Sequence, residues 1–176
     1  VLTVRRLVKR TGVDRLIDAV PALRAQVPGV RVLIAGVGAE SEALARRIEE
    51  QDLGESVRLL GRLSEAELPL AYRAADLTVV PSVALEGFGL IVPESLAAGT
   101  PALVTPVGGR PETVEDLSSA LILRDATPAA IAEGLAAALL DRSVLPDAAT
   151  CSAFARSRYD WDVVTRRTAD LYRRIS

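Results

Sequence analysis

Short runs of β-branched and aliphatic residues alternate with longer segments of helical period along the chain. The runs that predict strands are residues 1–5, 31–35, 57–60, 77–80, 101–104 and 120–123. The segments that predict helices are residues 13–26, 40–52, 64–75, 89–98, 110–116, 128–141, 147–158 and 161–175. Strands that alternate with helices form parallel sheets whose two faces are both covered. The pattern therefore predicts an α/β fold, a doubly wound parallel sheet of about six strands.

Several boundaries of these elements carry local signatures. Ser64 and Glu67 have the spacing of a capping box, and Thr127 stands as an N-cap before a proline that opens a helix. Gly99 stands where a C′ glycine ends a helix. Pro21 conflicts with the helical pattern around it, because a proline inside a helix removes a hydrogen-bond donor. We therefore expect a kink or a break in the first helix at Pro21.

The composition is that of an ordinary globular domain. The chain has 176 residues, enough to bury a sizeable core, with 49% hydrophobic residues, 25% charged residues and a formal net charge of −2. No apolar run is long enough to span a bilayer, and the N-terminus carries no signal-peptide pattern. Because Val1 stands in place of a methionine and already belongs to a predicted strand, we expect a fragment cut at a domain boundary.

The residue types that the chain lacks narrow its chemistry. There is no histidine, the commonest general base and metal ligand, and Cys151 is the only cysteine. Lys9 is the only lysine beside twenty arginines, which are spread along the chain and matched by acidic residues. Nucleic-acid binding needs a clustered basic face, often with stacking aromatics, and aromatics are only 3% of this chain. We therefore expect no nucleic-acid partner, and chemistry that uses carboxylates, arginines, hydroxyls and backbone amides.

Residues 81–94 are the most informative segment. A predicted buried strand is followed by a loop with Glu86, a Gly-x-Gly turn and a helix, and Glu94 stands eight positions after the first carboxylate. The first turn of a helix has unpaired N–H groups and a partial positive charge, and glycine allows close approach, so a diphosphate can bind there. Glu94 lies one helical turn after Leu90, where a carboxylate suits the hydroxyls of a ribose. The arrangement predicts a site for a nucleoside diphosphate.

Further short motifs follow in order along nearly the whole chain. They are Arg6-Leu7 with Gly12-Val13-Asp14, then residues 34–38, 60–63, 98–101 and 108–112. Together with the glutamate pair, they resemble the motifs of retaining glycosyltransferases with two Rossmann-like domains (the GT-B fold), glycosyltransferase family 4 in particular. The resemblance is to the C-terminal, donor-binding half of such an enzyme. It implies a Rossmann-like domain that binds a nucleotide-diphosphate sugar and lacks its N-terminal acceptor domain.

The resemblance also implies roles for single residues. Glu86 matches the position that approaches the donor sugar and supports positive charge near the anomeric carbon. Arg6 matches the arginine that stabilises the departing diphosphate, and Glu94 matches the glutamate that binds the ribose. Backbone amides would meet the diphosphate at Gly87, Phe88, Gly89, Leu90 and Ile91. The alternatives are a solvated loop acid for Glu86, a surface arginine for Arg6 and a solvent-facing helix residue for Glu94.

Two further glycine loops follow predicted strands. Gly36 and Gly38 form half of a dinucleotide fingerprint, but Ser41 stands where the third glycine should be, which argues against a nicotinamide cofactor. The resemblance implies instead a close backbone loop beside the nucleotide. The second loop would flank the base, with its arginine either stacked on the base or solvated; it comprises Gly61, Arg62 and Leu63.

One position departs from the family pattern. The family usually has a lysine immediately before Gly12, as a second cation on the diphosphate, and this chain has Thr11. A hydroxyl can donate a hydrogen bond but cannot neutralise charge, a loss on the order of 1–3 kcal/mol. Lys9 and Arg10 are the nearest cations that could take that role.

The sequence therefore predicts the donor-binding domain of a retaining glycosyltransferase, with a nucleotide-diphosphate sugar as substrate, no cofactor and no metal. We expect the fragment alone to be inactive and the full-length enzyme to be cytoplasmic, with membrane contact only peripheral. The terminal helix, residues 161–176, either crosses to the missing domain, packs on its own sheet or is partly exposed. Two alternatives remain: a sugar-nucleotide epimerase-like enzyme, against which the lack of histidine counts, and a non-catalytic nucleotide-sugar-binding homologue, which Thr11 makes conceivable.

Overall fold

The computed structural model describes residues 1–84, 87–109 and 111–175. Its centre is a parallel sheet in the order β3-β2-β1-β4-β5. The strands are β1 (Leu2–Val4), β2 (Val32–Ala35), β3 (Val57–Gly61), β4 (Thr78–Val80) and β5 (Ala102–Val104). The chain starts in the middle, moves outward to β3, and then returns to add β4 and β5 on the other side of β1. This is the doubly wound parallel sheet that the sequence predicts.

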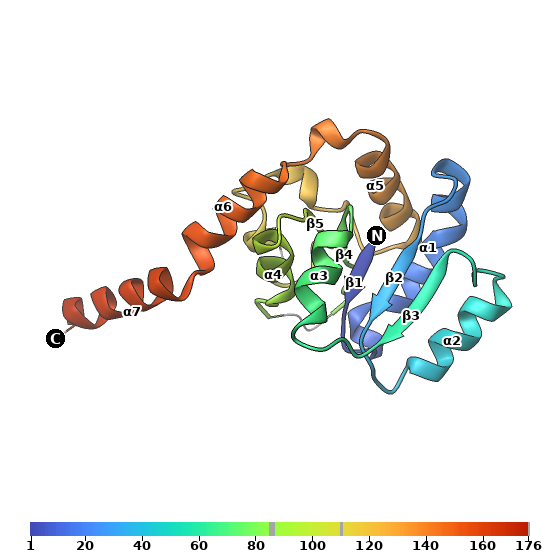
Figure 1. The fold of residues 1–176 in the computed structure, drawn as a ribbon, viewed down its shortest axis with the longest axis horizontal. Helices are drawn as coiled ribbons and strands as arrows, with labels where there is room; N and C mark the ends of the chain where they lie inside the picture. Colours follow the sequence, from blue (N-terminus) through green and yellow to red (C-terminus); the bar gives the residue numbers. More distant parts are fainter. Residues whose placement is uncertain (85–86, 110, 176) are drawn as a thin grey trace.

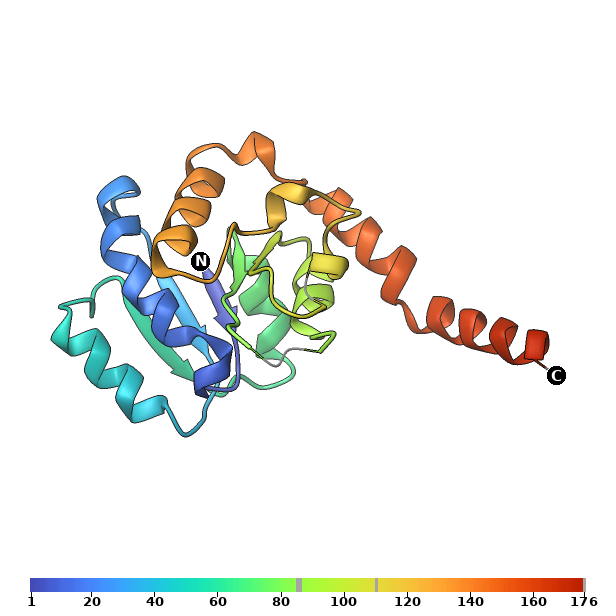
Figure 2. The same cartoon turned by 180° about the vertical axis from the view of Figure 1, so that it is seen from behind.

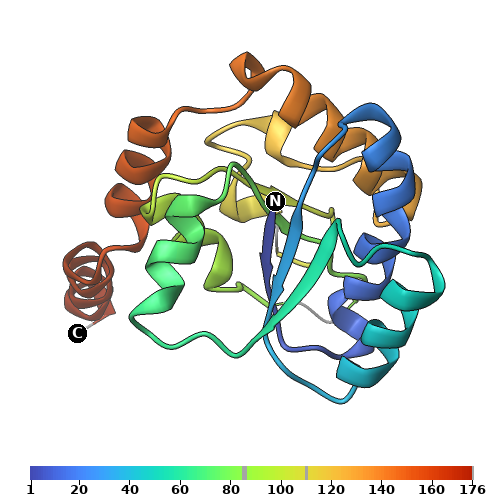
Figure 3. The ribbon, with the colours of Figure 1, turned by 45° about the vertical axis from the view of Figure 1, so that its right-hand side comes forward.

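Helices cover both faces of this sheet. They are α1 (Val13–Gln26), α2 (Ser41–Glu50), α3 (Glu67–Ala74), α4 (Ile91–Ala97), α5 (Pro128–Leu140), α6 (Ala148–Tyr159) and α7 (Trp161–Ile175). Figure 3 shows α1, α2 and α5 on one face and α3 and α4 on the other. Figure 2 shows α1 and α5 side by side, and α6 packs against α4 before it leads into α7, which projects from the body (Figure 1). Within the described residues, no helix is both long and apolar enough to cross a membrane.

The alternation of side chains along the strands builds two apolar layers. In β2, Val32 and Ile34 belong to the larger core, which includes residues of α1 and α5. The residue between them, Leu33, packs with Ala35 in a smaller cluster that includes Tyr72 of α3. Because successive side chains of a strand point to opposite faces, one short strand supplies both layers.

The caps that the sequence predicts are confirmed. Glu67 accepts hydrogen bonds from both the backbone N–H and the hydroxyl of Ser64, at 2.8 and 2.7 Å. Thr127 Oγ1 accepts a hydrogen bond from the N–H of Ala130 at 3.2 Å, which caps α5. Gly99 has φ +86°, the left-handed conformation that ends a helix.

The sixth strand predicted at residues 120–123 is wrong. The chain forms a 3₁₀ turn, η3 (Ser119–Leu121). Ser118 caps this turn, because its side chain accepts a hydrogen bond from the N–H of Ala120. Only Ile122 remains extended enough to pair, and it forms an isolated parallel bridge with Val104 of β5. The side-chain cap competes with the sheet for this segment, so the sheet stops at five strands.

The helix predicted at residues 110–116 is also wrong, because the described part of that region, residues 111–116, contains only the 3₁₀ turn η2 (Pro111–Thr113). The carbonyl oxygen of Thr113 accepts a hydrogen bond from the Tyr159 hydroxyl at 3.2 Å, a tertiary contact in place of a helical one. Of the kink or break predicted at Pro21, the break is wrong as well, because α1 runs through this residue. Pro21 is exposed while Val20 and Leu23 are buried, so packing of the opposite face holds the helix together.

Backbone approaches backbone very closely where the loops leave the sheet. A Cβ on Gly36 would lie 1.8 Å from the carbonyl oxygen of Arg5, and Gly36 has φ +137°. A Cβ on Gly12 would lie 1.9 Å from the carbonyl oxygen of Pro81, and one on Gly38 would lie 2.1 Å from a carbonyl oxygen of the loop after β1. No side chain fits at these three positions without moving a loop.

We predict that Gly36→Ala lowers the free energy of unfolding by more than about 2 kcal/mol, because it combines overpacking with a strained φ. Urea denaturation measures this difference. Gly54→Ala is the matched control, since a Cβ there would meet no heavy atom within 4 Å. Equal effects of the two substitutions would show that the close approach at Gly36 is relaxed in solution.

An ion pair joins α1 to α2. Arg47 donates to both carboxylate oxygens of Asp18 at 2.6 Å, and Gln51 adds a hydrogen bond at 2.8 Å. The Arg47 hydrogen bonds hold the pKa of the Asp18 carboxyl below its usual value. Because 40% of the Arg47 side chain and 26% of the Asp18 side chain are exposed, solvent screens part of this interaction.

We predict that Asp18→Asn lowers the free energy of unfolding at pH 7 by about 0.5–1 kcal/mol, the range for a screened ion pair. A carboxyl with a lowered folded-state pKa stabilises above its unfolded pKa, and this contribution is lost as the pH falls through the folded pKa. The difference between wild type and variant should therefore shrink toward zero in acid. Urea titrations at pH 7 and pH 2 measure it, with the exposed Glu49→Gln as control. A difference that persists at pH 2 would contradict the ionic origin.

Candidate functional site

The loops after β1, β2 and β3 enclose a cavity at the carboxyl edge of the sheet. This carboxyl-edge cavity has a volume of about 390 Å³. It is lined by Val4, Arg5, Arg6, Ala35, Gly36, Val37, Arg62, Leu63, Leu68 and Ile91. In open parallel sheets, ligands bind outside the carboxyl ends of the strands, near the point where the strand order reverses. The cavity lies beside that point, because its residues follow the central strand β1.

Three arginines make this cavity a candidate anion site. Arg6 and Arg62 are exposed, whereas Arg5 is only 6% exposed. Arg5 donates a hydrogen bond at 3.0 Å to the hydroxyl of Ser82, which lies just after β4. A guanidinium presents a planar set of N–H donors that matches phosphate oxygens, so the three cations together suit a diphosphate.

Arg5 is a site residue that the sequence motifs do not indicate. By its pattern it is the last position of a predicted strand, and the motifs give the phosphate role to Arg6 alone. The available signal was a charged residue at the end of an otherwise apolar strand, which places its side chain at the edge where ligands bind.

The carboxylate of Glu94 is held by a tyrosine. The Tyr72 hydroxyl donates to Oε2 of Glu94 at 3.0 Å, which joins α3 to α4. Tyr72 is 1% exposed and Glu94 is exposed. Burial and, after it, the neighbouring Glu94 charge raise the pKa of Tyr72 far above its usual value, so the phenol stays a proton donor. Tyr72 is the second site residue that the sequence analysis missed, because it reads as one more core position of an amphipathic helix.

The helix that carries Glu94 is anchored by buried hydroxyls. The Ser95 hydroxyl lies 2.8 Å from Oγ1 of Thr78 in β4 and 2.9 Å from the carbonyl oxygen of Thr100. The Thr100 hydroxyl in turn donates at 2.7 Å to the carbonyl oxygen of Tyr72. All three hydroxyl residues are buried. The contacts therefore fix α3, α4 and the start of β5 relative to one another.

The Gly-x-Gly turn leads directly into α4. Gly89 has φ +71°, and the N-cap residue, Leu90, has no side-chain oxygen to accept hydrogen bonds from the first turn. Phe88 is half exposed and its ring meets Tyr159 edge-on at 5.4 Å between centroids. A Cβ on Gly109 would lie 3.9 Å from the carbonyl oxygen of Gly87, so the two glycine loops lie against each other.

The predicted binding residues fall on two sides of α4. Ile91 lines the carboxyl-edge cavity together with Arg6, Gly36, Arg62 and Leu63. Phe88, Leu90 and Glu94 instead line a second cavity of about 650 Å³ between α4 and the junction of α6 with α7. Its other lining residues are Pro93, Ala97, Ala155, Arg156, Tyr159, Asp160, Trp161 and Val164.

Three other predicted residues, Thr11, Gly38 and Gly61, form hydrogen bonds within the loops. Thr11 is 2% exposed, and its hydroxyl lies 2.6 Å from the carbonyl oxygen of Val8 and 3.0 Å from that of Arg6. Its single proton is thus engaged within the chain. The N–H of Gly38 donates to Ser41 Oγ at 3.1 Å, and the carbonyl of Gly61 accepts from the N–H of Gly36.

Lys9 and Glu86, two residues to which the sequence gives a role, are not among the described residues that line the carboxyl-edge cavity. Lys9, a substitute cation in the sequence analysis, is exposed on the short 3₁₀ turn η1 (Lys9–Thr11) and does not line the carboxyl-edge cavity. Glu86, the expected catalytic carboxylate, lies outside the described residues.

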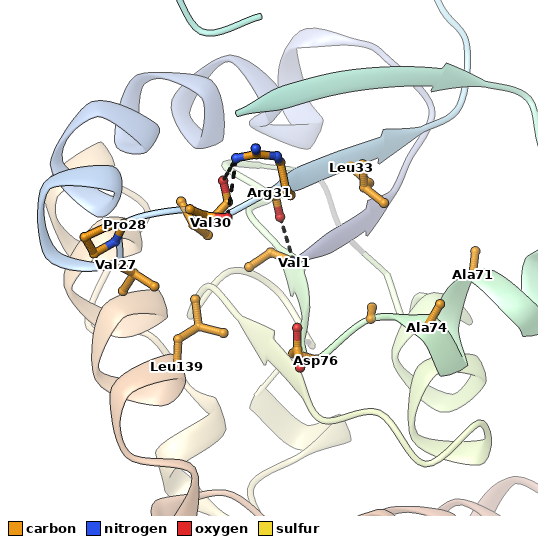
Figure 4. A pocket seen from close by; sticks show the side chains of 12 residues that line it. Val1, Val27, Pro28, Val30, Arg31, Leu33, Ala71, Ala74, Asp76 and Leu139 are labelled. Atoms are coloured by element: carbon orange, nitrogen blue, oxygen red, sulfur yellow. Dashed lines mark hydrogen bonds between the residues drawn. The ribbon is translucent and has the colours of Figure 1, made fainter. Parts of the chain in front are cut away.

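A further cavity of about 400 Å³ lies at the opposite edge of the sheet (Figure 4). Its residues precede the strands: Val1 before β1, Arg31 before β2 and Asp76 before β4. The N–H of Val1 donates to the carbonyl oxygen of Arg31 at 2.8 Å. Because ligands of open parallel sheets bind at the carboxyl ends, this amino-edge cavity is the weaker candidate.

Proteins of known activity are similar to nearly the whole chain. The chain is 29% identical over 180 residues to a GDP-mannose-dependent phosphatidylinositol monomannoside mannosyltransferase of Mycobacterium tuberculosis, which covers 98% of this chain and 47% of the relative. It is 36% identical over 178 residues to a glycogen synthase of the same species, with coverage of 97% and 41%. The chain thus spans about half of the length of these relatives or less.

Solved structures share the fold. The sucrose-phosphate synthase of Thermosynechococcus elongatus superposes with a TM-score of 0.84 at 27% identity, over 99% of this chain and 45% of that one. The HepE protein of Anabaena, solved in complex with UDP and glucose, superposes with a TM-score of 0.84 at 24% identity, over 97% and 47%. Residues 1–158 of this chain match the family described as glycosyl transferases group 1. The chain belongs to that family.

Proposed function

We propose that this domain binds the nucleoside diphosphate of a sugar donor at its carboxyl edge. The observation that carries the proposal is the carboxyl-edge cavity, which three arginines line beside the helix that presents Glu94. Guanidinium groups suit phosphates, and a fixed carboxylate suits two vicinal hydroxyls. A nucleoside diphosphate contains both groups in one molecule.

In this proposal each loop contacts one part of the donor. Arg6 and the amides of residues 87–91 bind the diphosphate, Glu94 binds the ribose, and the loop of residues 61–63 flanks the base. Arg5, buried beside Ser82, adds positive charge at the same edge in a chain that has Thr11 in place of a lysine. The site would use no metal ion.

The reaction belongs to the whole protein, of which we propose that this chain is the donor half. An acceptor hydroxyl would attack the anomeric carbon while the bond from that carbon to the diphosphate breaks, with retention of configuration, as in glycosyltransferase family 4. Arg6 and the helix amides would stabilise the leaving group, and Glu86 would act on the donor sugar. A cytoplasmic location remains a prediction.

The acceptor would be bound by a domain that precedes this chain. The support is that the relatives are about twice as long as the part they share with it. The helix α7 supports the same view, because Trp161, Leu171 and Ile175 are 82%, 59% and 72% exposed. The first of these relatives is named as a mannosyltransferase, which favours transfer over epimerisation.

We predict that the chain binds a nucleoside diphosphate with millimolar affinity, because half of the cleft wall is absent. A ligand-observed NMR titration with UDP, GDP and ADP measures this and identifies the base. Glu94→Gln should weaken that binding by about 1.5–3 kcal/mol, the range for a hydrogen bond to a charged group. Glutamine keeps an oxygen for Tyr72, so the melting temperature should barely change.

Glu94→Ala provides the contrast. It removes the acceptor of a buried phenol, so it should also lower the free energy of unfolding, by about 1–3 kcal/mol. Absence of binding for every nucleoside diphosphate, or unchanged binding by Glu94→Gln, would count against the proposed site.

We predict that Arg6→Gln weakens binding of the nucleoside diphosphate by about 1.5–3 kcal/mol but leaves the free nucleoside unaffected, since the lost contact is to phosphate. The effect should be smaller at high salt, which screens an exposed charge. Lys9→Gln is the matched control, because it removes one exposed charge from the same loop outside the cavity. The same titrations at low and high salt measure all three proteins. An equal loss in both variants would show that only the overall charge matters.

A further inference from the structure

Tyr72 is a buried tyrosine whose hydroxyl reaches the exposed carboxylate of Glu94, at 3.0 Å from Oε2. We propose that Tyr72 is a positioning residue, which orients the Glu94 carboxylate so that its free lone pairs meet the two ribose hydroxyls of the donor nucleotide. The inference rests on the proposed function, because it concerns the ribose part of that site.

Tyr72 has a fixed place from which to act. Its side chain packs with Leu2 of β1 and Ala35 of β2 in the smaller apolar cluster. Its carbonyl oxygen accepts the hydrogen bond of the buried Thr100 hydroxyl at 2.7 Å. The ring is held by packing and the backbone by a hydrogen bond, so the phenolic oxygen has one position near α4.

Glu94 needs such a partner. An exposed glutamate on a helix surface otherwise samples several rotamers, and freezing them on ligand binding costs entropy. The backbone of Glu94 is already fixed, because the adjacent Ser95 bonds to Thr78 and to the carbonyl oxygen of Thr100. Only the side-chain torsions remain free, and the Tyr72 hydrogen bond restricts them before the ligand arrives.

The hydrogen bond leaves the carboxylate able to bind. An ionised carboxylate has about four lone-pair sites on two oxygens, and Tyr72 uses one of them. Oε1 and the second lone pair of Oε2 remain available, which matches the two donors of a vicinal diol. Burial and the Glu94 charge raise the pKa of Tyr72, so the phenol remains protonated at neutral pH and donates to the carboxylate.

The test compares two ligands that differ only at the ribose. The nucleoside diphosphate that binds best and its 2′,3′-dideoxy analogue are titrated by NMR against wild type, Tyr72→Phe, Glu94→Ala and the double variant. We expect wild type to prefer the ribose form. Tyr72→Phe should weaken that form by about three- to tenfold, the cost of ordering one flexible side chain on binding, and leave the dideoxy analogue unchanged. The double variant should bind no more weakly than Glu94→Ala alone, since Tyr72 acts through the Glu94 carboxylate and alanine leaves no group for it to orient.

Tyr172→Phe is the control, because it also deletes a phenolic hydroxyl, on a residue of α7 that is 65% exposed and lines neither cavity beside α4. It should leave the ratio of the two affinities at the wild-type value. Equal losses for both ligands in Tyr72→Phe, or a further loss in the double variant, would overturn the positioning role and leave the proposed function standing. If wild type binds neither ligand, or binds both equally, the ribose site itself fails, and the positioning role fails with it.

Discussion

The carboxyl edge of this domain depends on backbone packed directly against backbone. At Gly12, Gly36 and Gly38 a carbonyl oxygen of a neighbouring loop occupies the space where any other residue carries its Cβ. The loops after β1, β2 and β4 are therefore held at separations that side chains would not allow. The arginines of the carboxyl-edge cavity project from this frame, so their positive charges lie close together at one edge of the sheet.

The buried hydroxyls between the sheet and α4 are held by hydrogen bonds to one another and to the backbone. Thr78, Ser95 and Thr100 are buried and satisfy one another or a backbone carbonyl, so none requires water. Their chain of hydrogen bonds runs from the sheet through α4 to the carbonyl of Tyr72. The last hydrogen bond of this chain is the one from the Tyr72 hydroxyl to the solvent-exposed carboxylate of Glu94. A hydrogen-bonded core thus connects to the surface through one side chain, which gives Glu94 a fixed geometry that most exposed glutamates lack.

Much of the fold was predictable from the sequence, because residues close together in the chain determine where its helices and strands begin and end. The alternation of strands and helices, the capping box at Ser64 and the glycine at 99 all depend on residues close in the chain. The strand predicted at residues 120–123 and the helix predicted at residues 110–116 were wrong because a contact other than the local pattern determines the backbone conformation. Ser118 caps a 3₁₀ turn where the pattern predicts a strand. The Tyr159 hydroxyl donates to the Thr113 carbonyl oxygen, which a helix would use for its own hydrogen bond. The same holds for the site. Motifs indicated Arg6 and Glu94, whereas the partners of Arg5 and Tyr72 lie far away in sequence.

The exposure of α7 also determines what a melting experiment on this chain reports. The helix packs mainly on α6, and none of its described side chains is buried. An isolated helix of this length is only marginally stable in water, so its amide protons should exchange with solvent while the sheet remains folded. Cooperative unfolding then belongs to the sheet and the helices that cover it. The last helix behaves as a separate segment that can order or fray without changing the geometry of the carboxyl edge.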